Sequence, residues 1–207
     1  MDSLNLEKNI YECNSDLLSD EDDMLCILYN MKSISTKTVS KTKIGYDKLK
    51  KLYTYPVIKY SCDEWQVIGI EYRSADFHFP KNPNKLPKTP TGMAMINSYI
   101  MGYTDSLCVV EDYTEGYTLL QYLTEKNKDK YFHIVTASNG VQNLVKCLQE
   151  IDYSKYKKYY LYINNNETSN KIKLQIFENY PQFEPVKIKC NCKNFNEHYY
   201  KCLKGGK

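Results

Sequence analysis

The feature that most constrains the fold is an alternation of short apolar segments with longer amphipathic ones, which begins at residue 107 and continues almost to the end of the chain. Strands joined by helices of this length run parallel, and the helices then cover both faces of the sheet. We therefore predict an α/β fold with a central parallel sheet flanked by helices. Strands are expected at 107–110, 132–136, 159–163 and 186–189, and helices at 115–125, 141–149, 168–179 and 197–203.

The residues before this alternation predict a smaller unit of a different kind. Apolar residues between 24 and 31 recur at helical spacing, and the segments 56–60 and 66–73 alternate in polarity like the two strands of a hairpin. Four prolines between 80 and 90 indicate a loop. We expect an N-terminal arm at 1–18, either mobile or packed, a helical and β-hairpin subdomain at 19–105, the α/β domain at 106–204 and a flexible tail at 205–207.

Composition and charge exclude several classes of protein. Hydrophobic residues make up 42% and charged residues 26%, which is usual for a globular protein that buries a core. No apolar run approaches the roughly 18 residues of a membrane span, and the first residues lack the basic and apolar regions of a secretory signal. We therefore expect a cytoplasmic protein without membrane contact, in which the cysteines remain thiols.

Polar residues follow each predicted strand, at the edge where parallel α/β sheets bind their ligands. Glu111 follows the first strand, 138–140 (Ser-Asn-Gly) the second, 164–167 (Asn-Asn-Asn-Glu) the third and 193–197 (Lys-Asn-Phe-Asn-Glu) the fourth. This series resembles the Toprim domain, which DnaG-type bacterial and phage primases share with topoisomerases and related nucleases. The region 28–73 is similar to the helical preface and first hairpin of the primase catalytic core.

The resemblance implies a chemistry and also a departure from it. In the family a glutamate acts as general acid or base and aspartates hold Mg²⁺, and Glu111 stands at the position of the glutamate. Amides stand where three aspartates are expected, at Asn164, Asn166 and Asn194. Because an amide oxygen lacks the charge that strips water from Mg²⁺, we predict a site without a cofactor in which Glu111 is a vestigial catalytic group, with Glu115 near the family's later acid.

Positive charge concentrates in the last quarter of the chain. Residues 151–207 contain eleven lysines and five acids, whereas the whole chain has a formal net charge of only +3 and a single arginine, Arg73. Lysines bind phosphates without regard to sequence, and tyrosine rings offer stacking faces for bases, although solvated lysines and packed tyrosines would give the same pattern. The lysines predicted to bind single-stranded DNA or RNA are Lys155, Lys157, Lys158, Lys171, Lys173, Lys187, Lys189 and Lys193.

These features together predict a primase-like Toprim protein of a phage or mobile element that binds nucleic acid without catalysis. Two alternatives remain open from the sequence. An inactivated Toprim fold could instead bind a host or viral protein, for example as an inhibitor of a CRISPR effector or of another defence system. With Glu111, Asp112 and Glu115 as a rebuilt Mg²⁺ site, the chain would be an active DNA primase.

Three cysteines and one histidine near the C-terminus have the ligand types of a zinc site. Thiolate and imidazole groups suit zinc chemically. A Cys-x-Cys pair followed by five residues before the histidine is not a common zinc spacing, so the sequence favours ordinary thiols beside a C-terminal helix. The four residues are Cys190, Cys192, His198 and Cys202.

Overall fold

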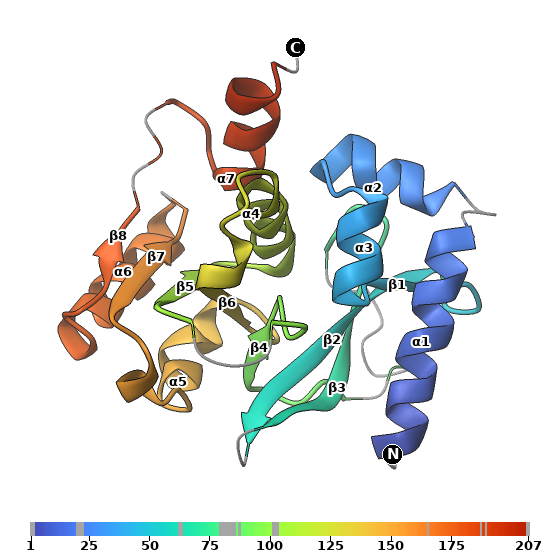
Figure 1. Cartoon of the computed structure of the whole chain (residues 1–207), viewed down its shortest axis with the longest axis horizontal. Coiled ribbons are helices and arrows are strands. Elements are labelled where there is room, and N and C mark those ends of the chain that lie inside the picture. The colour runs from blue at the N-terminus through green and yellow to red at the C-terminus, as the bar shows by residue number, and fades with distance from the viewer. Residues whose placement is uncertain are drawn as a thin grey trace.

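The computed structural model contains two units that lie side by side, an N-terminal unit of helices and an antiparallel sheet and a C-terminal α/β unit (Figure 1). The predicted fold class is confirmed, because a mostly parallel sheet with helices on its faces follows a helical and hairpin unit. None of the described helices is both long and apolar enough to cross a bilayer. The structure describes residues 3–19, 23–61, 64–78, 86, 88–100, 104–164, 166–186, 188 and 190–205.

The N-terminal unit is built on a three-stranded antiparallel sheet with the order β1-β2-β3. The predicted hairpin is its main part, because β2 and β3 pair along their length with an irregularity between Val57 and Ile58. Ser35 begins α3 by accepting a hydrogen bond from the backbone N–H of Thr38, a role that serine favours. The elements are α1 (Ser3–Ser19), α2 (Met24–Lys32), α3 (Thr36–Thr42), β1 (Gly45–Asp47), β2 (Leu52–Ser61) and β3 (Glu64–Arg73).

The N-terminal segment forms the packed helix α1. The sequence alone had left open whether this arm is mobile or packed. Leu6 and Ile10 lie in an apolar cluster with residues of β3, and Leu17 belongs to the main core. The approach of β1 to α1 is so close that a Cβ added at Gly45 would lie 2.6 Å from the Cβ of Cys13. The buried residues recur every three or four positions, so α1 packs along one side of the antiparallel sheet.

The C-terminal unit contains a five-stranded sheet with the order β4-β6-β5-β7-β8. The last four strands of this order are parallel, whereas β4 pairs with β6 in the antiparallel sense. Short 3₁₀ turns lie at Asp129–Tyr131, Val141–Asn143 and Tyr153–Lys155. The main elements are β4 (Met93–Met95), β5 (Ser106–Val110), α4 (Tyr113–Glu125), β6 (Phe132–Ala137), α5 (Leu144–Leu148), β7 (Lys158–Tyr162), α6 (Glu167–Asn179), β8 (Glu184–Pro185) and α7 (Phe195–His198), which a π-helical turn continues (Tyr199–Leu203).

Helices cover both faces of this sheet. Along β5, Cys108 and Val110 lie in the same apolar cluster as α4, while Leu107 and Val109 lie in the cluster that contains α5 and α6. Because neighbouring residues of a strand point to opposite faces, α4 covers one face of the sheet and α5 and α6 cover the other. All residues of β5 are buried, which is typical of a central parallel strand.

Two strands differ from the sequence-based prediction. The last strand of the sheet was predicted at 186–189, of which 187 and 189 lie outside the described residues; the strand that the structure describes is β8 at Glu184–Pro185, which pairs with Tyr160 and Leu161 of β7. The backbone N–H of Val186 still donates to the carbonyl oxygen of Leu161 at 3.0 Å, so the pairing with β7 reaches the start of the predicted segment. β4 was not predicted, because three residues after a proline-rich loop are too few to show a period.

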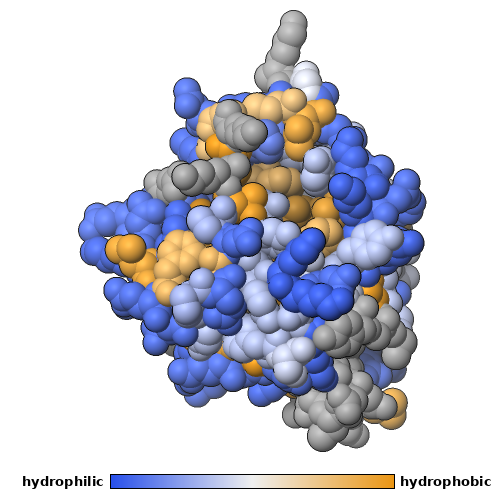
Figure 2. All heavy atoms as spheres, turned by 60° about the vertical axis from the view of Figure 1, so that its left-hand side comes forward, coloured by the Kyte–Doolittle hydropathy of each residue, from blue (hydrophilic) through white to orange (hydrophobic). Residues whose placement is uncertain are grey.

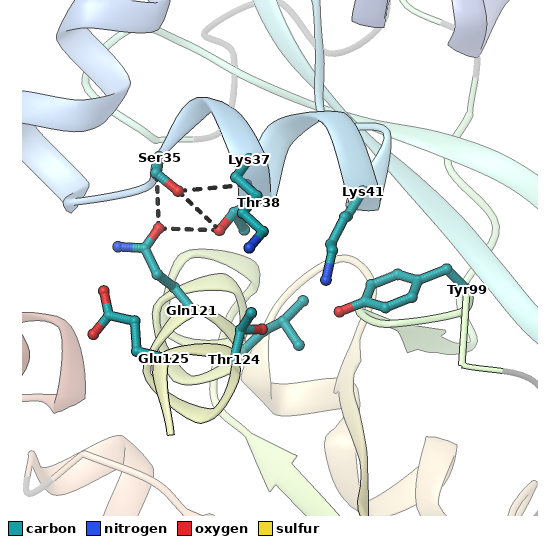
Figure 3. Close-up of a pocket in the computed structure, with 9 residues that line it drawn as sticks. Ser35, Lys37, Thr38, Lys41, Tyr99, Gln121, Thr124 and Glu125 are labelled. Atoms are coloured by element: carbon teal, nitrogen blue, oxygen red, sulfur yellow. Dashed lines mark hydrogen bonds between the residues drawn. The ribbon is translucent and has the colours of Figure 1, made fainter. Parts of the chain in front are cut away.

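A buried polar network joins the two units between α3 and α4 (Figure 3). The side-chain amide of Gln121 on α4 donates to the Ser33 carbonyl oxygen at 2.7 Å and to the Tyr199 hydroxyl at 2.9 Å. Its Oε1 accepts from the backbone N–H of Ser35 at 2.8 Å and from the Thr38 hydroxyl at 3.0 Å. One buried amide thus fixes the start of α3 against the middle of α4.

A pocket of about 140 Å³ lies next to this network, between α3 and α4 (Figure 3). Two of its charged lining residues, Lys41 and Glu125, already have partners. Nζ of Lys41 lies 3.8 Å from Oδ2 of Asp129 and over the ring of Tyr99. Oε1 of Glu125 accepts a hydrogen bond from the Tyr199 hydroxyl at 2.7 Å. The pocket therefore belongs to the junction of the units and lies beside the second half of α4, away from the strand ends.

Candidate functional site

The C-terminal ends of β5 and β7 bring together two of the residues that the sequence singled out. Val110 and Tyr162 are paired as the last residues of these parallel strands. Just beyond them, the backbone N–H of Asn164 donates to Oε2 of Glu111 at 2.9 Å. The ring of Phe195 packs against Tyr162 with centroids 5.6 Å apart, so α7 begins beside the same edge. We call this region the strand-end site.

Glu115 lies in the first turn of α4 and is only 2% exposed. Burial raises the pKa of its carboxyl group well above the ordinary value, and the charges of Asp112 and Glu111 raise it further, while Asn164 and Lys32 oppose the rise. Among the described residues, no group donates a hydrogen bond to Oε1 of Glu115. This carboxyl group keeps its proton to a higher pH than an exposed glutamate, and a protonated carboxyl is a poor metal ligand.

Three residues of the strand-end site begin helices. Each accepts, through its side-chain Oδ1, a hydrogen bond of 2.9 Å from the backbone N–H three residues later. Aspartate and asparagine cap helices about equally well. An asparagine at such a position therefore preserves the start of the helix and removes only the charge. The caps are Asp112 for α4, Asn166 for α6 and Asn194 for α7.

Lysine side chains lie beside both glutamates of the site. Nζ of Lys173 donates to the carbonyl oxygen of Asn164 at 3.5 Å. Burial lowers the pKa of Lys173, and the carboxylate of Glu111 opposes that effect. The positive charge of Lys32, the last residue of α2, acts to lower the pKa of Glu115 and so favours its ionised form. Protein cations therefore already balance part of the negative charge that remains here.

A buried ion pair from the N-terminal unit reaches the same edge of the sheet, and the sequence did not reveal it as part of the site. Glu71 on β3 is 1% exposed, and its Oε1 accepts from Nε of Arg73 at 2.7 Å. Its Oε2 accepts from the backbone N–H of Asn139, in the turn after β6, also at 2.7 Å. Burial raises the pKa of Glu71, Arg73 opposes the rise, and Asp112 adds to it. The sequence could have indicated this pair, because an acid stands two residues before the single arginine and residues two apart in a strand lie on the same face.

Three of the eight lysines that the sequence singled out lie at the opposite edge of the sheet from this site. Lys158 is the first residue of β7, and Lys155 and Lys157 precede it, so all three lie at the opposite end of the strand pair from Glu111. Lys155 and Lys157 also face aspartates, at 3.9 and 3.2 Å. The sequence-based prediction grouped these three lysines with the other five because all eight lie in the basic last quarter of the chain.

Other predicted lysines lie near the strand-end site. Lys173 contacts Asn164, Lys171 lies one turn into α6, where it pairs with an acid at 2.8 Å, and Lys193 directly precedes the cap of α7. Lys187 and Lys189 lie outside the described residues. Figure 2 turns the side of the molecule with β7, β8 and α6 toward the viewer and shows a mostly hydrophilic face with small apolar patches.

Most of the tyrosines in contact with one another are packing residues. Tyr55 of β2 stacks on Tyr113 and Tyr117 of α4, with ring centroids 5.1 and 5.8 Å apart, and all three are buried. These rings hold the two units together and are closed to bases. The rings that remain open to a stacking ligand are exposed ones such as Tyr29 and Tyr200.

Comparison with solved structures decides the fold. The chain is similar to the Escherichia coli primase catalytic core, at 14% identity and a TM-score of 0.66, over 98% of this chain and 75% of that one. The chain has the fold of the DnaG-type primase catalytic core. It is also similar, at 16% identity and a TM-score of 0.64, to a bacteriophage T7 structure in which the lagging-strand DNA polymerase interacts with primase domains bound to an RNA/DNA hybrid and dTTP, over 85% of this chain and 84% of that one.

A third similar structure is a DnaG primase catalytic domain bound to single-stranded DNA, at 11% identity and a TM-score of 0.59, over 98% of this chain and 77% of that one. The sequence itself matches no family model and no curated protein. The likeness thus rests on the shared fold, and what the strand-end site can do must be argued from its own residues.

The primase fold implies Mg²⁺, and the residues present here fit that ion poorly. Mg²⁺ requires anionic oxygens in octahedral geometry. Glu111 lies at the strand-end site, and its Oε2 already accepts a hydrogen bond from the backbone N–H of Asn164. The carboxyl of Glu115 is buried and favours its neutral form, so only Glu111 and Asp112, the cap of α4, remain here as candidate charged ligands. Amides cap the other two helices, so this donor set lacks the clustered charge that the ion needs.

Proposed function

We propose that this protein binds single-stranded nucleic acid on a primase fold and does not polymerise nucleotides. The observation that carries the proposal is the replacement of charge by amide at the helix caps Asn166 and Asn194, next to a buried Glu115. Phosphoryl transfer needs divalent ions that bridge the phosphates and neutralise their charge. A site without clustered carboxylates cannot hold those ions tightly.

The same change favours binding of the nucleic-acid backbone. Carboxylates without metal ions repel phosphates, whereas amide and ammonium groups offer hydrogen-bond donors to them. Lys171, Lys173 and Lys193 are the lysines next to the strand-end site. The structures with a similar fold that contain single-stranded DNA and an RNA/DNA hybrid support nucleic acid as the ligand class.

Catalysis and metal binding are tested on the purified protein. We expect no templated oligonucleotide synthesis in the presence of Mg²⁺ or Mn²⁺, and no saturable Mg²⁺ binding below millimolar concentration in isothermal titration. Templated product, or tight Mg²⁺ binding that disappears in Glu111→Ala, would show that the protein is an active primase with a rebuilt metal site and would overturn the proposal.

Binding is tested with a labelled single-stranded oligonucleotide at several salt concentrations. Lys171→Gln/Lys193→Gln should weaken binding and make the negative slope of log K against log salt shallower by about 0.7 for each phosphate that a lysine no longer neutralises. The matched control, Lys157→Gln/Lys158→Gln, removes the same charge at the opposite edge of the sheet and should bind like the wild type. Equally weakened binding in both variants would point to unspecific attraction, and no binding at all would favour a protein partner; either result contradicts the proposal.

A further inference from the structure

Four side chains with zinc-ligand chemistry converge at the C-terminal end of the chain, outside the strand-end site. Cys190 and Cys192 lie in the loop before α7, His198 is the last residue of α7, and Cys202 lies in the π-helical turn that follows. Their ligand atoms all lie within 4.8 Å of one another. The sequence favoured separate thiols, because residue spacing alone does not show that the loop folds back onto the helix.

Two of the separations between these atoms are close to those around a tetrahedral ion. Sγ of Cys192 lies 3.7 Å from Sγ of Cys202, and Sγ of Cys190 lies 3.2 Å from Nδ1 of His198. Zn–S bonds of about 2.3 Å and a Zn–N bond of about 2.0 Å, at tetrahedral angles, require about 3.8 Å between sulfurs and about 3.5 Å between sulfur and nitrogen. The sulfur–sulfur separation is also far longer than the disulfide bond of about 2.0 Å.

The local structure brings the ligands into this arrangement. His198 and Cys202 are four residues apart on a continuous helical segment, so both lie on one side of it. The end of the loop is attached to the helix, because the backbone N–H of Lys193 donates to Oε2 of Glu197 at 2.6 Å. A loop fixed directly after Cys192 has only a short reach, which directs its two thiols toward the helix.

We propose that Cys190, Cys192, His198 and Cys202 bind one zinc ion in a structural site. All four positions of the tetrahedron are occupied by protein side chains, so no position is open for water or substrate, as catalysis would need. Three soft thiolates also select zinc over the hard ions Mg²⁺ and Ca²⁺. The site is thus independent of the metal chemistry of the strand-end site.

The ion would stabilise the segment that closes the junction of the two units. α7 has only four helical residues, too few to be stable by itself. Yet it carries Asn196, whose side-chain amide donates to the hydroxyl of Thr118 on α4 at 2.8 Å and to the carbonyl oxygen of Lys32 at the end of α2. Zinc bound by residues on both sides of α7 would hold this small helix between α2 and α4.

The first measurement is the metal content of the full chain, purified without chelators. We expect one zinc ion per chain by mass spectrometry of the elements. X-ray absorption at the zinc edge should show three sulfurs at about 2.3 Å and one nitrogen at about 2.0 Å. Cobalt added to the metal-free protein should give the intense visible absorption of a tetrahedral thiolate complex. None of these readouts depends on nucleic-acid binding or polymerisation, so their outcome is separate from that of the proposed function.

Variants assign the ligands. Cys192→Ser and Cys202→Ser should each lose the bound zinc, whereas Cys26→Ser, at an exposed cysteine on α2, should keep it. A wild-type protein that contains no zinc and takes up none on titration would overturn the proposal, and so would zinc retained by both single variants. A disulfide between Cys192 and Cys202 in the purified protein, seen as a reversible mass change under reductant, would equally contradict it.

Discussion

Glu71 and Asn139 lie 68 positions apart in the sequence, yet the backbone N–H of Asn139 donates to Oε2 of Glu71 across 2.7 Å. The carboxylate belongs to the hairpin of the N-terminal unit, and the amide belongs to the turn after β6 of the α/β unit. Arg73 pairs with the other oxygen of Glu71. This contact therefore fixes the orientation of the two units beside the strand-end site.

We predict that Glu71→Ala destabilises the protein by roughly 3–5 kcal/mol, because the change removes the buried carboxylate that pairs with Arg73, whose side chain is only 13% exposed. The free energy of unfolding, measured by urea denaturation, checks this. The double variant Glu71→Met/Arg73→Met removes both charges and should be clearly less destabilised. A single variant within about 1 kcal/mol of the wild type would mean that the pair is not buried in solution.

The buried carboxyl of Glu115 predicts a dependence of stability on pH. Its pKa is raised well above 4.5 in the folded chain by burial, with Asp112 and Glu111 adding to the rise and Lys32 opposing it. Between 4.5 and the raised value, the folded state binds a proton that the unfolded state has released. The free energy of unfolding therefore falls as pH rises through this window.

Glu115→Gln removes this titration, so its stability should gain on that of the wild type as pH increases from about 4.5. Parallel denaturation series at several pH values give the difference directly, and the subtraction cancels every other titrating group. A difference that stays constant with pH would show that Glu115 titrates normally. A difference that changes in the opposite direction would mean that its carboxylate is stabilised in the folded state.

The elements that were predictable from the sequence are those whose signal is local. The apolar run Leu107–Val110 in β5 and the helical spacing of α4 carry their pattern within about ten residues, and the order of such elements already indicates a parallel sheet. The position of Glu111 at a strand end follows from the same pattern. What the sequence could not reveal are contacts between distant segments, such as Glu71 with Asn139 or the four side chains that meet around α7.

The buried amide of Gln121 predicts that the two units unfold together. Gln121→Ala would leave the Ser33 carbonyl and the Ser35 N–H, which both face α4, without this partner, at about 1–3 kcal/mol for each unsatisfied group. We expect the free energy of unfolding to fall by about 3 kcal/mol and hydrogen exchange in α3 to become faster. Gln149→Ala, the same change at an exposed position, should leave both unchanged. Faster exchange confined to α4 would contradict a shared junction.

The amide positions predict that metal binding can be restored without damage to the fold. Asn164→Asp/Asn166→Asp/Asn194→Asp introduces three negative charges at the strand-end site, and Mg²⁺ requires such anionic oxygens. Asp caps as well as Asn, and a negative charge at a helix N-terminus is favourable by about 0.3–1 kcal/mol, so α6 and α7 should keep their starts. We expect saturable Mg²⁺ binding by isothermal titration.

The control for this variant is Asn179→Asp, which adds a negative charge at the far end of α6 and should bind no Mg²⁺. Adding Glu111→Gln to the triple variant should abolish the restored binding, because Glu111 is the carboxylate that faces Asn164. A triple variant that folds normally by circular dichroism but binds no Mg²⁺ would show that charge alone does not separate this site from a metal-binding one. In that case the geometry fixed by Asp112 and the buried Glu115, rather than the three amides, would account for the difference.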